Sequence, residues 1–333
     1  MTDPAWPAAT PSAAPPAWPV EGLRAWAGEW FAHRGLAVRE ASVVRAMPWA
    51  SVLCFELEGP LGPSVVWGKA ASPPMAVEID LLPVLARAAP GAVLPPIVTD
   101  PRRGWVLLPD GGPTVAHLHP DAALPAWRSA LQEYARLQHT VTPYAADLAA
   151  AGAPDLRPGA AADLVAELAD RDDLHLAGAP HGLTGDELRR LRHIAVPGAR
   201  AAARRLADGE IPATVQHDDL SPSNALLDGR WVDWADASLA HPFASLLTAL
   251  DGTSGRPGGP SHVPTLRQAY LAVWADLTGV RSEVLEQEAD LAVMLAPVGR
   301  VVAWLRAGPA ALDLYPGSIT RWLRRLADTR WPA

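Results

Sequence analysis

After residue 19, the hydrophobic positions of the chain follow first the spacing of a helix and then the short runs of β-strands. Leucine and aromatic residues recur at a spacing of three or four positions over 20–34, which predicts a helix that ends at Gly35. The following runs are rich in Val, Leu and aromatic residues and are broken by Pro48 and by the turn at 59–63. They predict a meander of three antiparallel strands, at 43–44, 51–57 and 64–69.

A helix and another pair of strands complete this β-rich part. Two consecutive prolines predict the start of a helix over 75–87, because proline is well tolerated in the first helical turn. Pro83 lies inside that helix and predicts a kink or an early end. Strands are expected near 97–98 and 104–108, before a turn at 109–112.

The remainder of the chain has a mostly helical pattern with one β interruption. Helices are expected near 122–139, 159–170, 184–207, 263–278, 282–307 and 317–328. A strand is expected at 213–216, followed by a hairpin over 225–232. Asp228 and Gly229 predict the hairpin, because this pair between two apolar runs favours a tight turn. The sequence has no internal repeat of fixed period.

These elements predict an α+β fold with two lobes. The small β-rich lobe spans 20–110 and the larger helical lobe spans 111–333, with the boundary within 109–114. Proline recurs every few residues over 1–19, so a disordered tail is expected there.

Composition narrows the class of protein. With 49% hydrophobic and 19% charged residues, the chain of 333 residues fits a soluble globular protein. A net charge of −8 argues against a general nucleic-acid binder. The single cysteine, Cys54, excludes a disulfide within the chain and is expected to be a buried, inert thiol. No long apolar run predicts a membrane span, the first residues lack the basic start of a secretory signal, and a cytoplasmic location is expected.

One segment carries residues suited to phosphoryl transfer. Asp219 is followed five residues later by Asn224, and Asp233 comes at the end of the predicted hairpin. Phosphoryl transfer needs a carboxylate that orients the attacking hydroxyl, ligands for a metal ion and a cation on the phosphates. Asp219 fits the first role. Asn224 and Asp233 supply the oxygen ligands that Mg²⁺ prefers.

The pattern His217-x-Asp219-x-x-x-x-Asn224, with Asp233-Trp234 downstream, resembles the loops of the aminoglycoside phosphotransferase and choline kinase group. These small-molecule relatives of protein kinases have H-G-D-x-x-x-x-N followed by D-[WF]-x-D. The resemblance implies a bilobal protein-kinase-like fold, in which Asp219 is the catalytic base and Asn224 and Asp233 bind Mg²⁺. It also implies a structural role for His217.

The sequence departs from that pattern at two places. Asp218 stands where the family usually has glycine, so two adjacent aspartates compete for the role of base, and the spacing to Asn224 favours Asp219. The stretch from Asn224 to Asp233 is also shorter than in relatives. The tight turn at Asp228 and Gly229 can absorb this difference.

The β-rich lobe offers a candidate cation for the phosphates. Lys69 is the only lysine among 28 basic residues, and lysine and arginine are not interchangeable at such a site. It ends a predicted strand, where kinase-like folds place the phosphate-binding lysine, and Glu78 would be its helix partner. No G-x-G-x-x-G motif is present, and the turn at 47–51 would contact the phosphates through Ser51 or backbone amides. The resemblance also implies a hinge for the nucleotide base at 107–110, which includes Leu108 and Asp110.

The function expected from these residues is that of a small-molecule kinase. It would use Mg²⁺ and ATP or GTP to phosphorylate a hydroxyl of a small acceptor, such as an aminoglycoside or a related metabolite. Two other interpretations stay open: a kinase-like protein that binds nucleotide without catalysis, and a metal-dependent phosphohydrolase built on His217-Asp218. The acidic residues of the predicted helix at 282–307 are expected to form a solvated face. Most of the 14 tryptophans are expected in the core, although Trp304 and Trp322 could line a substrate cleft.

Overall fold

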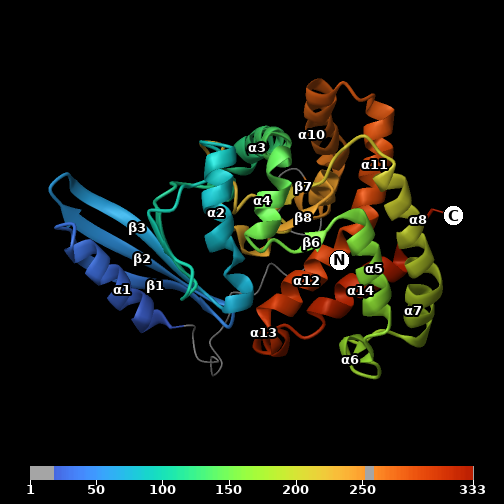
Figure 1. Ribbon diagram of the computed structural model, residues 1–333, viewed down its shortest axis with the longest axis horizontal. Coiled ribbons are helices and arrows are strands. Elements are labelled where there is room, and N and C mark those ends of the chain that lie inside the picture. Colours follow the sequence, from blue (N-terminus) through green and yellow to red (C-terminus); the bar gives the residue numbers. More distant parts are fainter. Residues whose placement is uncertain (1–18, 252–258, 333) are drawn as a thin grey trace.

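The computed structural model describes residues 19–251 and 259–332, and Figure 1 shows its two lobes side by side. The predicted tail at 1–19 lies, except for Pro19, outside the described residues. The small lobe contains a five-stranded antiparallel sheet of order β1-β2-β3-β5-β4. Its strands are β1 (Ala37–Met47), β2 (Ala50–Gly59), β3 (Gly62–Ala71), β4 (Val98–Asp100) and β5 (Trp105–Pro109).

The predicted α+β fold is confirmed, and most strands lie where the sequence placed them. Strand β1 is much longer than the predicted 43–44. The prediction was too short because nearly all residues of β1 are exposed, so no alternation of hydrophobic and polar residues marks the strand in the sequence. The division of the chain at residue 110 stays a prediction.

Helix α1 (Val20–Ala32) packs on one face of this sheet. Phe31 lies against Phe55 of β2, with ring centroids 5.3 Å apart, and Gly68 of β3 faces the same side. A Cβ atom at Gly68 would lie 2.8 Å from the Phe55 ring, so the position of that ring between the sheet and α1 depends on glycine there. Since side chains alternate along a strand, the next residue, Lys69, points to the opposite face, away from α1.

Helix α2 (Val77–Ala88) follows a 3₁₀ turn at Pro73–Met75 and connects the sheet with the helical lobe. The early end predicted from Pro83 is wrong, because the helix continues for five residues beyond it. Leu81, Leu82 and Leu85 are buried in the core of the helical lobe, and this burial offsets the backbone hydrogen bond that proline removes.

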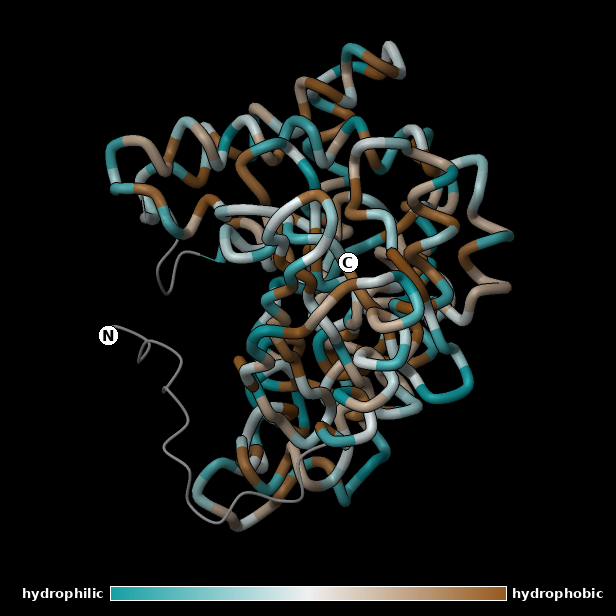
Figure 2. The backbone as a smooth tube through the Cα atoms, turned by 90° about the vertical axis from the view of Figure 1, so that its left-hand side faces the viewer, coloured by the Kyte–Doolittle hydropathy of each residue, from teal (hydrophilic) through white to brown (hydrophobic). Residues whose placement is uncertain are grey.

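The larger lobe is mainly helical. Its helices are α3 (Pro120–Val141), α4 (Ala145–Ala150), α5 (Pro158–Ala169), α6 (Asp172–His175), α7 (Gly185–Arg190), α8 (Val196–Ala207), α9 (Leu246–Leu250), α10 (Val263–Thr278), α11 (Ser282–Leu295), α12 (Pro297–Ala307), α13 (Pro309–Leu314) and α14 (Ser318–Asp328). Figure 2 shows brown and teal positions alternating along many of them, as expected for helices that bury one side. Four of the tryptophans, Trp127, Trp231, Trp234 and Trp274, are fully buried.

Two long helices predicted from the sequence are interrupted by proline. The helix expected over 184–207 consists of α7 and α8, joined by a π-helical stretch at Leu191–Ala195 just before Pro197. The helix expected over 282–307 divides into α11 and α12 at Ala296, before Pro297. Proline has no N–H to continue the helical ladder, which accounts for both positions.

A second, three-stranded sheet has the order β6-β8-β7 and lies at the start of the functional segment. It consists of β6 (Asp155–Leu156), β7 (Thr214–Gln216) and β8 (Ser238–Ala240), of which only β7 was predicted. The predicted hairpin is present in short form, since Ala225 pairs with Trp231 and the Leu226 N–H donates to the Arg230 carbonyl at 2.9 Å. Gly229 has φ +90°, which suits a glycine in such a turn.

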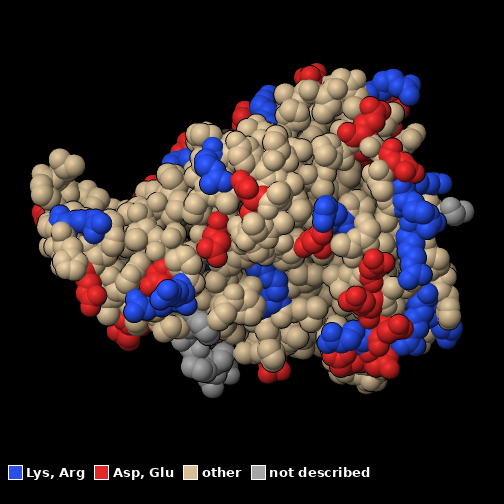
Figure 3. Space-filling model, viewed as in Figure 1, with Lys and Arg blue, Asp and Glu red and all other residues tan. Residues whose placement is uncertain are grey.

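Charged residues on the surface of the helical lobe are mostly mixed in sign. Basic and acidic side chains lie next to one another along the edge formed by α6, α7 and α8 (Figure 3), where Arg192 pairs with Asp172. The acidic face expected on α11 is only partly solvated, because Glu288 is 5% exposed and bonds to His241. Within the described ranges, no helix is long and apolar enough to cross a membrane.

Candidate active site

A cleft of about 1100 Å³ lies between the sheet of the small lobe and the helical lobe. Its walls include all but one of the site residues predicted from the sequence: Lys69, Glu78, Leu108, Asp110, Asp219, Asn224 and Asp233. Ser51 is the exception, because its side chain is fully buried and the cleft is lined by Ala50 and Val52 on either side of it. The turn that contains Trp49 still borders the cleft, so backbone groups there remain candidates for phosphate contacts.

Lys69 connects the two lobes through a pair of carboxylates. Its Nζ lies 2.5 Å from Glu78 Oε2 and 2.6 Å from Asp233 Oδ1. Burial alone would lower the pKa of Lys69, but the charges of Asp233 and Glu78 outweigh it and raise that pKa above its usual 10.5. In turn, the Lys69 ammonium lowers the pKa of Asp233 below its usual 3.8, against the opposing effect of burial.

The backbone around Asp233 is held in place by the same carboxylate that binds Lys69. Glu78 Oε1 accepts a hydrogen bond of 2.9 Å from the Trp234 N–H. Asp233 has φ +64°, a left-handed conformation that aspartate adopts more readily than most residues. The Trp234 side chain is fully buried and anchors the turn in the core of the helical lobe. Its ring centroid lies 4.7 Å from that of the His217 ring.

Asp219 and Asn224 lie together on the helical side of the cleft. The Asn224 Nδ2 donates to the Asp219 carbonyl at 2.9 Å and to Asp219 Oδ2 at 3.2 Å. Because the amide nitrogen is engaged in this way, the amide oxygen of Asn224 is the atom left to serve as a metal ligand.

His217 and Asp218, by contrast, are turned away from the cleft. The His217 ring is buried, with Nε2 2.9 Å from the Val232 carbonyl, and Asp218 is 2% exposed. Of the two adjacent aspartates, Asp219 is therefore the one that faces the cleft. The phosphohydrolase interpretation needs the His217-Asp218 pair to converge on a metal, and this arrangement does not provide that. Among the described residues, no three His, Cys, Asp or Glu side chains are grouped so that they could hold a metal ion.

The buried carboxyl of Asp218 has an unusual acidity. Burial raises its pKa from 3.8 to about 7, although hydrogen bonds from Ser238 and the charge of Arg300 act in the opposite direction. Since the folded state holds this proton more tightly than the unfolded state, Asp218 makes the protein less stable as the pH rises from about 4 to 7.

Asp218→Asn is therefore expected to stabilise the protein at pH 8 relative to the wild type. The rise in the pKa of Asp218 from 3.8 to about 7 means that the wild type loses free energy of unfolding of the order of 4 kcal/mol between low pH and pH 8, whereas the variant does not. The free energy of unfolding, measured in urea at pH 4.5 and at pH 8 for both proteins, should show a variant advantage that grows with pH. An advantage that is the same at both pH values would contradict this acidity of Asp218.

The strand that ends at the cleft and the segment after it lie where a hinge for the nucleotide base is expected, and that role stays a prediction. Leu108 of β5 and the residues up to Thr114 line the cleft. The Asp110 side chain accepts a hydrogen bond from Trp67 Nε1 at 2.9 Å, so it holds the end of β5 against β3. Cys54 is half-buried rather than buried, because it lies with Trp67 on the face of the sheet opposite the one that packs against α1.

Several further residues of the cleft were not selected as site residues from the sequence, among them Arg300, Asp236, Trp49 and Trp304. Arg300 of α12 donates from Nη1 to Asp236 Oδ2 and to the Asp218 carbonyl, both at 2.7 Å. Trp49 and Trp304 meet across the two lobes with ring centroids 6.1 Å apart. The downstream Asp236 was visible as part of the D-[WF]-x-D pattern, but no sequence signal separates Arg300 from the other arginines. Trp322 is buried in the core and does not line the cleft.

Comparison with known proteins adds evidence at the level of the fold. No protein-family model and no curated protein sequence matches this chain. Among solved structures, choline kinase from Streptococcus pneumoniae has a TM-score of 0.55 at 14% identity, covering 92% of this chain and all of its own. Ethanolamine kinase from Plasmodium vivax has a TM-score of 0.57 at 10% identity, covering 87% of this chain and 82% of its own.

Aminoglycoside phosphotransferases are also similar. A thermostable mutant of APH(4)-Ia, in a ternary complex with ADP and hygromycin B, has a TM-score of 0.50 at 14% identity. The match covers 92% of this chain and 96% of that one. The chain has the fold of choline kinases and aminoglycoside phosphotransferases. The resemblance read from residues 217–234 is confirmed at this level, and the roles of the individual residues stay predictions.

Proposed function

We propose that the protein is a small-molecule kinase that transfers the γ-phosphoryl group of ATP or GTP to a hydroxyl of a small acceptor. The observation that carries this proposal is the contact of Lys69 with both Glu78 and Asp233 across the cleft. Asp219 and Asn224 border the same cleft, so one space holds the charged groups that phosphoryl transfer needs.

Asp219 is the base in this proposal. Its carboxylate would accept the proton of the acceptor hydroxyl and orient that oxygen toward the γ-phosphorus. The hydrogen bonds from Asn224 hold the Asp219 side chain and its carbonyl, so the base is oriented before the acceptor arrives. Orientation of this kind is where a kinase gains most of its rate, because the transferred group needs little covalent help.

The oxygen donors of the cleft fit magnesium. An Asn224 amide oxygen and an Asp233 carboxylate are hard ligands, and Mg²⁺ commonly takes one or two protein ligands besides phosphate oxygens and water. When bound, the ion would neutralise charge on the nucleotide phosphates. Lys69, which lies between Glu78 and Asp233, would bind phosphate oxygens from the side of the sheet.

The acceptor would lie on the α12 side of Asp219. Trp49 and Trp304 border this part of the cleft, and Asp236 and Arg300 supply polar groups. An aminoglycoside or a related hydroxylated metabolite is the acceptor class we propose, because Asp219 and Asp236 can face amino groups while the indole rings contact the ring faces of a sugar.

Thermal unfolding tests the nucleotide site directly. The wild type should be stabilised by ATP or GTP with Mg²⁺, by about 2.7 kcal/mol at a ligand concentration of 100 times Kd, which is several degrees in Tm. Asp233→Ala should lose this stabilisation, because it removes a proposed metal ligand and the partner of Lys69.

Asp228→Ala is the matched control for this measurement. It removes an aspartate from the surface hairpin, where Asp228 pairs with Arg230, and it should keep the wild-type shift. If neither nucleotide stabilises the wild type at millimolar concentration, the proposal is wrong. If nucleotide binds but no acceptor is phosphorylated in a screen of amino sugars and amino alcohols, a nucleotide-binding protein without catalysis becomes the better description.

A further inference from the structure

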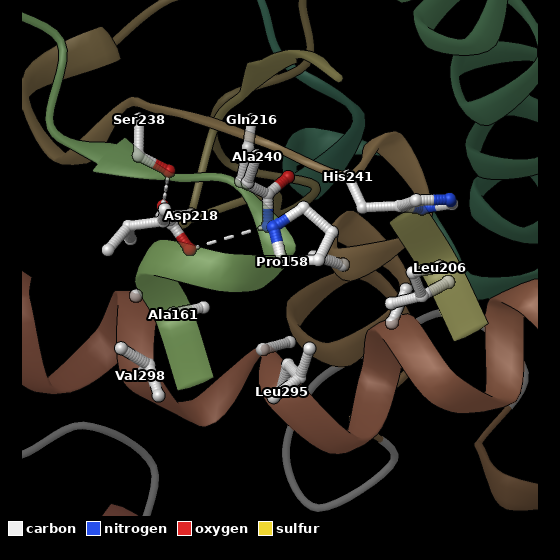
Figure 4. Close-up of a pocket in the computed structure, with 15 residues that line it drawn as sticks. Pro158, Ala161, Leu206, Gln216, Asp218, Ser238, Ala240, His241, Leu295 and Val298 are labelled. Atoms are coloured by element: carbon white, nitrogen blue, oxygen red, sulfur yellow. Dashed lines mark hydrogen bonds between the residues drawn. The ribbon is translucent and has the colours of Figure 1, made fainter. Parts of the chain in front are cut away.

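Asp218 and Asp219 point to opposite sides of the catalytic segment. Asp219 borders the cleft, whereas the Asp218 side chain is buried behind it, next to a small cavity of about 20 Å³ (Figure 4). There Asp218 Oδ2 accepts from the Ser238 hydroxyl at 2.6 Å and Oδ1 accepts from Gln216 Nε2 at 3.3 Å. The backbone of Asp218 has φ +60°, in the left-handed region that favours glycine.

Helix α12 contacts this buried carboxyl at Gly299. A Cβ atom at Gly299 would lie 2.8 Å from Asp218 Cγ and closer still to Oδ1, so any other residue would have to displace Asp218. Glycine inside a helix is unfavourable compared with alanine, and a packing contact of this kind is the usual reason for it. Asp218 and Gly299 therefore form a matched pair.

The next residue of the helix holds the backbone of the same aspartate. Arg300 Nη1 donates to the Asp218 carbonyl and to Asp236 Oδ2, both at 2.7 Å, and the Arg300 side chain is only 13% exposed. Asp236 follows Asp233 in the turn that faces Lys69. One helix thus contacts the side chain of Asp218, its carbonyl, and the turn that carries the proposed metal ligand.

We propose that Asp218 is a positioning residue: with Gly299 and Arg300 it anchors the catalytic segment to α12 and so fixes the direction of Asp219. This proposal rests on the proposed kinase function for its rate measurements. A base must lie within hydrogen-bonding distance of the proton it accepts, and an error of 1 Å in placement can cost roughly 100-fold in rate. The family pattern has glycine at the position of Asp218, and glycine has no side chain with which to form this anchor.

The test is a double-mutant cycle on the matched pair. Gly299→Ala should lower kcat by roughly 10- to 100-fold, because the methyl group displaces Asp218 and with it the neighbouring Asp219. Asp218→Gly should also lower kcat, since the anchor is lost while glycine accepts the left-handed backbone. The double variant should have a kcat close to that of Asp218→Gly alone, because the methyl group then occupies vacated space.

Two readouts separate positioning from a general loss of structure. In Gly299→Ala, kcat should fall whereas the KM for nucleotide stays within a factor of about three of the wild-type value. The size of the Mg²⁺-dependent Tm shift should stay within the same factor. Gly28→Ala is the control, because a Cβ atom there has no neighbour within 4 Å and the same substitution in helix α1 should leave kcat unchanged. Effects that simply multiply in the double variant, or an unchanged kcat in Gly299→Ala, would overturn the proposal.

Amide hydrogen exchange tests the same anchor without an activity assay. The backbone N–H groups of 219–224, which Pro222 lacks, should exchange faster in Gly299→Ala than in the wild type, and the double variant should exchange as Asp218→Gly does. If the wild type phosphorylates no acceptor but this exchange pattern appears, the proposed function fails and the anchor stands. If the wild type is active and exchange at 219–224 is the same in all variants, the anchor is wrong and the kinase function stands.

Discussion

Asp219→Asn is expected to lower kcat by roughly 10²- to 10⁴-fold, the range that a positioned general base contributes. Asparagine keeps the size of the side chain and can still accept the hydrogen bond from Asn224 Nδ2, so the segment should fold as before. It cannot take up the acceptor proton at neutral pH. Nucleotide binding, read as the Mg²⁺-dependent Tm shift, should stay near the wild-type value because Asp219 is not one of the proposed metal ligands.

The control for this prediction is Asp228→Asn, which makes the same chemical change nine residues along the chain. Asp228 lies at the tip of the hairpin and pairs with Arg230 on the surface, so kcat should be unchanged. A steady-state assay with ATP and the best acceptor from a screen supplies the comparison. An Asp219→Asn enzyme with more than about a tenth of the wild-type kcat would remove Asp219 from the role of base.

Four residues of the proposed site could be selected from the sequence because they carry local signals. Asp219, Asn224 and Asp233 stand at a spacing that a surface turn would not require, and Lys69 stands out as the single lysine. Lys69 lies two residues before the end of β3, and the other three lie in the loops around the hairpin, where the identity of a residue depends less on packing. Seven of the eight site residues predicted in this way line one cleft.

Other parts of the site depend on contacts that no local pattern reveals. Gly299 and Arg300 act on Asp218 from about 80 positions away in the sequence, and Trp49 meets Trp304 across the cleft. For Ser51, the place of the residue in the turn suggested a side-chain contact with phosphate. Strand alternation instead turns the Ser51 side chain into the interior of the lobe. Tertiary packing decides such positions.

Lys69→Met is expected to lower the free energy of unfolding by about 3–5 kcal/mol, the cost of removing one partner from a buried ion pair. Glu78 is 2% exposed, and in the described part of the chain its charge would keep only the Trp234 N–H as a partner. Adding Glu78→Gln to this variant should recover more than half of the loss, because the buried charge is then removed as well. Urea unfolding of the two single variants and the double variant at pH 7.5 measures the coupling.

An exposed ion pair serves as the control for this prediction, and the pH dependence of the stability loss tests it further. Arg87→Met breaks an exposed pair with Asp147 and should cost no more than about 1 kcal/mol. Because Lys69 lowers the pKa of Asp233, the stability from that contact is present above pH 3.8 and is lost as the pH falls through the lowered value. The difference between wild type and Lys69→Met should therefore shrink in acid. A loss for Lys69→Met no larger than that for Arg87→Met would mean that Lys69 is held by solvent rather than by the two carboxylates, and that the contact across the cleft does not join the two lobes.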